Sequence, residues 1–452
     1  MESSGANVRL NGPRRGSSRL LTVGSRAGVR EVVVDMVVQE VDDMPGDLAL
    51  DHLGLGPFPA SMMVFPRRLG PLAAAALAAG RTPDSEGEPR FLGYVLDGEI
   101  DRAKEELCLY PDQAWARYNL GVLSGEFDQD QDKDPVLSIL EHLALFILGR
   151  SDNLDPVLEK LDGEVPTAVR VYAGMVMLAL ASEQGKPEVV GVGLSLLSGL
   201  LEVVDPLPAA MIKRAILPFR NQLNLTPAEV ATGYREVVST LRGTDLLEDL
   251  GGAWLELAGV LHEMGRENPG YLREAVQCYQ ESTKIFSRTS APAMFASIQI
   301  DIAVCYLAMP MLESSDAVRF AVAISGLREA MEILTKESYP REWYAGRLNL
   351  ANALVYAPSA HVEANLVEAI TIYSSLVGEV DSGQDPLGYA RLMFNWGNAL
   401  AHLGDFVEAR SRLHEARRIF EEFECYDEVR EVRGILDSVE RHHARGVVDG
   451  AL

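Results

Sequence analysis

The sequence predicts an all-α protein built from repeated helical hairpins, preceded by a small β and irregular segment. Three observations predict this fold. Apolar residues recur at three- and four-residue spacing beyond about residue 90, capping residues followed by proline mark several helix starts, and one hairpin pattern returns four times. Strand-type alternation is nearly absent from that part of the chain.

Residues 1–30 differ in charge from the rest of the chain. Six arginines and one acid give this stretch a charge of +5, whereas the whole chain of 452 residues carries −25. We expect a disordered basic tail here. The pair Arg14-Arg15 is not followed by an apolar stretch of signal-peptide length, and no run in the chain reaches the ~18 apolar residues that a membrane-spanning helix needs. The sequence therefore predicts a cytoplasmic protein without a membrane partner.

Residues 31–90 predict a short β and irregular segment. The β-branched run VVVDMVVQEV at 32–41 favours one strand, and residues 61–65 favour a second. The stretch DDMPGD between them brings three aspartates close together, as in some magnesium sites. Pro45-Gly46 would break the helix that such a site needs, so we interpret this stretch as an acidic turn.

Residues 91–245 predict a helical region with degenerate repeats. Helix starts are indicated where a capping residue precedes proline, and Thr226 with Glu229 forms the pattern of a capping box. The starts, including one farther along the chain, are Asp134-Pro135, Asp155-Pro156, Thr226-Pro227 and Asp385-Pro386. Residues 165–220 are unusually apolar. We expect a tightly packed helical layer there, with a lipophilic pocket as the alternative.

Residues 246–425 carry the repeats. Near the carboxyl end the chain reads NWGNALAHLGDFVEARSRLHEARRIF, which places a small residue in a first helix, a turn, and alanines on a second helix. Alanines at corresponding positions upstream are spaced by 48, 46 and 40 residues. Small residues let antiparallel helices approach, and bulky residues fill the seam. The expected scaffold residues are Ala275, Tyr279, Ala323, Leu327, Ala369, Tyr373, Gly397, Ala409 and Leu413.

This pattern resembles the tetratricopeptide repeat (TPR). Because the spacing exceeds the usual ~34 residues, the repeats are similar to the extended repeats of kinesin light chains, over about residues 250–425. The resemblance implies a right-handed α-solenoid of about four hairpins, with a capping helix and tail at 426–452. It also implies that the first helices build a concave face that holds a peptide or a partner subunit.

Four asparagines are the candidate ligand-binding residues on that face. Asn349 and Asn352 in one repeat recur as Asn395 and Asn398 in the next. In TPR proteins that bind extended peptides, the resemblance implies that such asparagines hydrogen-bond the ligand backbone, since one amide offers a donor and an acceptor. The alternative is that they cap helices or form hydrogen bonds within the scaffold.

Arg347 and Arg391 are expected near the same surface. A guanidinium there could receive an acidic side chain or a terminal carboxylate. The full carboxylate clamp of the family is incomplete, since Asp301 and Glu256 stand where basic or amide groups would help.

Composition and motifs argue against several other classes of function. The strong acidity opposes nucleic-acid binding, which needs a basic surface. The acidic run from Asp128 to Asp134 lacks the glycine and the glutamate of a calcium loop, and no P-loop, GxSxG or GxGxxG motif occurs. Cys108, Cys278 and Cys305 lie in apolar helical patterns and are expected to be buried thiols. We expect no cofactor, no metal and no catalytic residue.

The sequence therefore predicts a non-enzymatic scaffold or adaptor for protein-protein interaction. One alternative is a self-assembling structural subunit or assembly factor, with the chain as a homo-oligomer. Another is an all-α small-molecule sensor or enzyme that uses the apolar helices of 165–220.

Overall fold

The computed structural model describes residues 48–49, 65–66 and 90–449, apart from gaps at 98, 111–113, 125–126, 128–134, 148–153, 162–164, 166, 185–186, 312–316 and 381. Several expectations lie outside the described residues: the basic tail, the strand at 32–41, the DDMPGD turn, and the acidic run of 128–134.

A two-stranded antiparallel ladder precedes the helices. β1 (Leu48–Ala49) pairs with β2 (Phe65–Pro66), with Leu48 opposite Pro66 and Ala49 opposite Phe65. Only Phe65 of the strand expected at 61–65 is described, and it lies in β2.

From Arg90 to Asp449 the described chain is helical, which confirms the predicted all-α class. Contacts divide the chain between Ala253 and Trp254 into two compact units, which we describe separately. The helices of the first unit are α3 (Arg90–Asp97), α4 (Ile100–Leu107), α5 (Ala114–Ser124), α6 (Pro135–Ile147), α7 (Asp155–Leu161), α8 (Thr167–Gln184), α9 (Pro187–Leu200), α10 (Pro206–Ile216), the 3₁₀ turn η2 (Leu217–Phe219) and α11 (Pro227–Leu241).

The apolar helices α8 and α9 approach each other closely. A Cβ added at Gly174 would lie 2.5 Å from Cγ of Leu197, and one added at Gly193 would lie 3.1 Å from Cβ of Met177. These glycines let the two helices share one continuous core, in which Met177 and Leu197 are fully buried. At these positions the space between the helices is occupied by side chains.

Helix starts follow the predicted capping signals. α6, α11 and α18 begin at the prolines predicted for them, and α7 begins one residue earlier, at Asp155. The capping box at α11 is confirmed. The hydroxyl of Thr226 accepts from the backbone N–H of Glu229 at 3.3 Å, and the backbone N–H of Thr226 donates to Oε2 of Glu229 at 2.8 Å.

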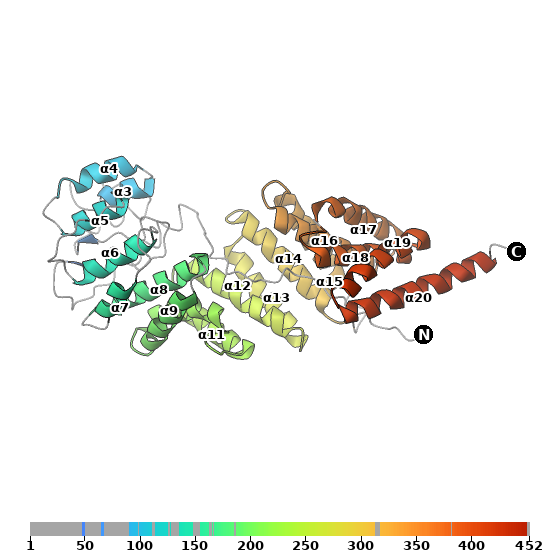
Figure 1. Ribbon diagram of the computed structural model, residues 1–452, viewed down its shortest axis with the longest axis horizontal. Coiled ribbons are helices and arrows are strands. Elements are labelled where there is room, and N and C mark those ends of the chain that lie inside the picture. Colours follow the sequence, from blue (N-terminus) through green and yellow to red (C-terminus); the bar gives the residue numbers. More distant parts are fainter. Residues whose placement is uncertain are drawn as a thin grey trace. The chain divides into compact units, whose positions relative to one another are not determined.

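The second unit contains successive helical hairpins (Figure 1). Its elements are the remainder of α12 (Leu247–Met264, which spans the division), α13 (Gly270–Ile285), α14 (Pro292–Ala308), α15 (Ala317–Ile333), α16 (Pro340–Tyr356), α17 (Val362–Leu376), the 3₁₀ turn η4 (Val377–Glu379), α18 (Pro386–Leu403), α19 (Phe406–Glu422) and α20 (Tyr426–Asp449). Each helix from α13 to α19 packs on the next in the chain. This sequential packing confirms the predicted TPR-like α-solenoid.

Small residues set the spacing of these hairpins. A Cβ at Gly397 of α18 would lie 2.8 Å from Cγ of Leu413 in α19, so only glycine permits the observed approach. Gly404, at φ +92°, ends α18 in the left-handed conformation. The final helix α20 buries Val429, Val432 and other apolar residues in the core that it shares with α19.

Candidate functional site

The first helices of the hairpins form a sheltered layer in the second unit. No side chain is fully exposed across 293–307 of α14, 342–357 of α16 or 386–401 of α18. The second helices α15, α17 and α19 expose a side chain on nearly every turn. Within these three spans the polar residues are therefore either buried or half-buried, and these two groups have different chemical roles.

Three of the four candidate asparagines are buried. Asn349 and Asn352 lie in α16 and Asn398 lies in α18, each no more than 9% exposed. The Tyr373 hydroxyl of α17 donates to Oδ1 of Asn352 at 2.7 Å, so this bond joins the two helices of one hairpin. Asn395 is half-buried and keeps partial access to solvent.

Asn398 connects neighbouring hairpins. Its Nδ2 donates to the Tyr356 hydroxyl, at the end of α16, at 2.7 Å. Burial raises the pKa of Tyr356, and the Asn398 bond opposes that shift. Asn352 and Asn398 thus form hydrogen bonds within the scaffold, which was the alternative interpretation of the sequence pattern.

Both candidate arginines are half-buried on first helices. The guanidinium of Arg347 lies 5.8 Å from the centroid of the Trp343 ring, and its Nη2 donates to Oγ of Ser375 in α17 at 3.5 Å. Arg391 lies in α18, one turn before Asn395. The accessible members of the predicted set are therefore Arg347, Arg391 and Asn395.

The last hairpin adds an aromatic and charged cluster that the sequence did not predict. The guanidinium of Arg412 in α19 lies 4.2 Å from the centroid of the Trp396 ring and also pairs with Glu408. Beside it, the Tyr389 hydroxyl donates to Glu415 at 2.8 Å. Burial and the Glu415 carboxylate raise the pKa of Tyr389. These contacts hold α18 against α19.

All the expected scaffold residues are buried in the second unit. They come from α13, α15, α17, α18 and α19, and they are Ala275, Tyr279, Ala323, Leu327, Ala369, Tyr373, Gly397, Ala409 and Leu413. Burial in the core explains why alanines and bulky residues recur at these positions. The pattern therefore requires no direct role of these residues in binding.

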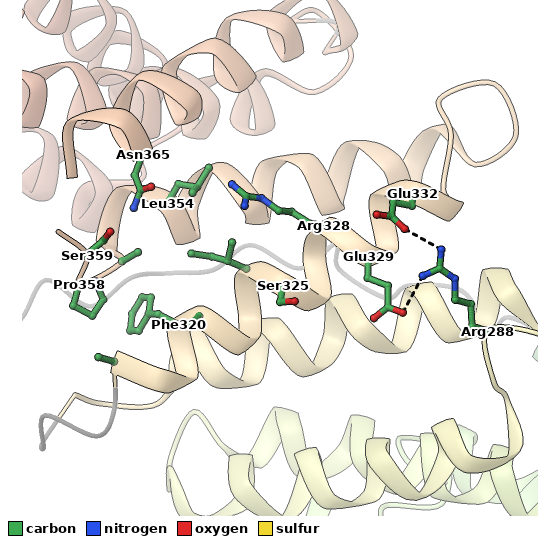
Figure 2. Close-up of a pocket in the computed structure, with 14 residues that line it drawn as sticks. Arg288, Phe320, Ser325, Arg328, Glu329, Glu332, Leu354, Pro358, Ser359 and Asn365 are labelled. Atoms are coloured by element: carbon green, nitrogen blue, oxygen red, sulfur yellow. Dashed lines mark hydrogen bonds and ion pairs between the residues drawn. The ribbon is translucent and has the colours of Figure 1, made fainter. Parts of the chain in front are cut away.

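A groove of about 600 Å³ lies along α15 (Figure 2). At one end, called the apolar end, the side chains of Phe320, Leu354 and Pro358 line the groove, and the polar side chains of Ser359 and Asn365 lie beside them. The other end is charged, because Arg288, in the connection before α14, forms ion pairs with Glu329 at 3.1 Å and with Glu332 at 2.9 Å. These two carboxylates raise the pKa of Arg288.

Arg328 lies between the two ends of the groove (Figure 2). It forms an ion pair with Glu368 of α17 at 2.9 Å. The partners of Arg288 and Arg328 are 40 to 44 residues away in sequence, which is about one repeat. These charged pairs therefore join successive repeats, from the connection before α14 to α15 and from α15 to α17.

One feature of the sequence indicates this groove. The segment AVRFAVAI at 317–324 is apolar on almost every side of the helix, yet Val318 is 64% exposed and Val322 is 46% exposed. A helix that packs on its neighbours through one face needs apolar residues only along that face. This helix carries apolar residues on its other faces as well.

Within the part of the chain that the structure describes, no three side chains of the His, Cys, Asp or Glu types gather as a metal site. Among those same residues, no helix combines the length and the apolar character needed to cross a membrane.

No family model and no curated relative matches this sequence. Solved structures with similar helical arrangements include the apo form of RapI, with 11% identity, a TM-score of 0.44, and coverage of 79% of this chain and 97% of that one. BtubC (BKLC) from P. vanneervenii has 19% identity and a TM-score of 0.35, and covers 57% and 91%. The P58(IPK) TPR domain has 15% identity and a TM-score of 0.28, and covers 83% and 95%. These likenesses concern the helical architecture alone, and the packed hairpins described above make the chain a TPR-like helical-repeat protein.

Proposed function

We propose that this chain is a non-enzymatic adaptor that binds an extended segment of a partner protein on the first-helix face of its second unit. The observation that carries the proposal is the sheltered layer of α14, α16 and α18, on which Arg347, Arg391 and Asn395 keep partial access to solvent. The buried Asn349, Asn352 and Asn398 support this face from within.

The accessible groups suit a peptide ligand. The amide of Asn395 can donate to a peptide carbonyl and accept from a peptide N–H at once. The guanidinium of Arg391 can pair with a carboxylate in a bidentate manner. Because both residues lie one turn apart on α18, a single extended segment can contact both.

Site-specific photocrosslinking in the native cell tests this proposal. A photoreactive phenylalanine analogue replaces Arg391 or Asn395 in the full chain, and matched controls carry it at Ser374 of α17 or Ser411 of α19, which are exposed on second helices. We expect one partner to crosslink from positions 391 and 395 and to be absent from 374 and 411. Equal crosslinking from all four positions contradicts a first-helix site.

The affinity of the partner identified in this way then provides a second measurement. We expect Arg391→Ala with Asn395→Ala to weaken binding in fluorescence polarisation, while Ser374→Ala with Ser411→Ala leaves it unchanged. Circular dichroism melts of both double variants check that the fold is retained. Unchanged affinity in the Arg391→Ala/Asn395→Ala chain would falsify the proposed site.

A further inference from the structure

The groove along α15 is a second candidate surface, separate from the first-helix face. We propose that it binds an extended partner segment that carries one bulky apolar side chain and, about four to six residues away, a lysine or arginine. The inference goes beyond the proposed function, because it concerns second helices and a different set of residues.

The apolar end of the groove fits an aliphatic or aromatic anchor. Phe320, Leu354 and Pro358 line this end. Val318 and Val322 extend apolar surface on the same helix into solvent, at 64% and 46% exposure. These two valines do not line the groove themselves, but exposed apolar side chains on the helix that lines it favour an interaction site.

The charged end favours a cation in the partner. Arg288 and Arg328 already pair with three carboxylates, those of Glu329, Glu332 and Glu368. At this end of the groove the single charge of Arg288 faces two carboxylates, those of Glu329 and Glu332, whereas the Glu368 partner of Arg328 lies outside the groove lining. The Glu332 side chain is 65% exposed, so a cation from a partner can reach it. Such charge complementarity sets partner choice and accelerates association.

The helix geometry sets the spacing of the two groups. Phe320 and Glu329 are nine residues apart and Phe320 and Glu332 are twelve apart, which is about 14 to 18 Å along a helix that rises about 1.5 Å per residue. An extended segment rises about 3.3 Å per residue, so it reaches Glu329 in about four residues and Glu332 in about five or six. The predicted spacing of the two ligand side chains is the distance along α15 divided by the rise per residue of the extended segment.

Phage display tests this inference with the full chain as bait and a random dodecapeptide library as the probe. We expect enriched peptides to carry an aliphatic or aromatic residue and, about four to six positions away from it, Lys or Arg. One enriched peptide is then labelled and titrated against variants by fluorescence polarisation. Ala321→Glu places a charge at an exposed position that lines the apolar end, and Glu332→Gln removes the excess carboxylate.

We expect Ala321→Glu to weaken binding of the peptide at least about tenfold and Glu332→Gln to weaken it about fivefold, as for one partly exposed charge pair. Glu422→Gln is the matched control, since Glu422 is also an exposed carboxylate paired with an arginine but lies on α19. It should leave the affinity unchanged. Melting curves confirm that all three variants are folded.

Three results overturn the inference. The first is a library that enriches no peptide or enriches acidic ones. The second is an enriched peptide whose affinity falls with Arg391→Ala/Asn395→Ala and not with Ala321→Glu, which would leave the proposed function intact. The third is a dimer of the full chain in light scattering that Ala321→Glu dissociates, because a second copy would then occupy the groove.

Discussion

The Tyr373 hydroxyl donates a 2.7 Å hydrogen bond to Oδ1 of Asn352, and both side chains are buried between α16 and α17. Burial raises the pKa of Tyr373 well above its usual value, so the hydroxyl stays protonated and remains a donor. In a dry interior each group depends on the other for its hydrogen bond. Asn352, one of the asparagines of the repeat pattern, is therefore a structural residue.

Asn352→Ala should destabilise the second unit by about 1–3 kcal/mol, because it leaves the Tyr373 hydroxyl buried without its partner. Urea unfolding followed by circular dichroism measures the change. Asn395→Ala, at the half-buried position, is the control and should stay within about 0.5 kcal/mol of wild type. Equal losses from both variants would show that the bond does not hold the hairpin.

Gly397→Ala should also destabilise this unit, by about 1–3 kcal/mol, because its new methyl group would lie 2.8 Å from Cγ of Leu413. Gly434→Ala in α20 provides the control, since nothing lies within 4 Å of its Cβ position. Alanine is the better helix former there, so Gly434→Ala should stabilise by up to about 1 kcal/mol. A lower melting temperature for Gly397→Ala with a higher one for Gly434→Ala would confirm the close approach. Higher melting temperatures for both variants would contradict it.

Local signals explain why the fold could be predicted. A capping residue before proline fixes a helix start within a few residues of sequence, as at Thr226 and Asp385, whose side chains accept backbone N–H groups in the structure. Small and bulky residues at hairpin spacing indicate the packing interface between two helices that are adjacent in the chain. Such signals require no knowledge of distant partners.

The surroundings of the candidate residues depend on distant contacts. Asn398 bonds to Tyr356, which is 42 residues away, and the groove along α15 is completed by Leu354 and Pro358 of the next repeat. A step of one residue turns a helix position by about 100°, so the pattern alone does not separate a buried asparagine from an accessible one. The expected burial of Cys108 is wrong for a similar reason, because α4 ends at Leu107 and leaves Cys108 exposed.

The capping box of α11 should make the local stability of this helix pH-dependent. Hydrogen bonds from the side chain and the backbone of Thr226 lower the pKa of Glu229 below its ordinary value. The carboxylate form is thus favoured in the folded state, and its contribution is present above the ordinary pKa and is lost as pH falls through the lowered pKa. NMR titration should show Glu229 with a depressed pKa that rises part of the way to the ordinary value in Thr226→Ala, which removes the hydroxyl bond and keeps the backbone N–H bond. An unchanged pKa in that variant would show that the box does not cause the shift.

The cysteines should separate by reactivity into exposed and buried classes. Cys108 is exposed and Cys425 is half-buried, whereas Cys278 and Cys305 are buried. Burial and the nearby Asp301 carboxylate raise the pKa of Cys305, which suppresses the thiolate that attacks an alkylating reagent. Intact-mass spectrometry after brief iodoacetamide treatment at pH 8 should show Cys108 modified first, and modification of Cys305 should require opening of the second unit.

In that case Asn352→Ala, which weakens the unit, should accelerate labelling of Cys305 while labelling of Cys108 keeps its rate. Rapid labelling of Cys305 in the native wild-type chain would contradict its placement in α14.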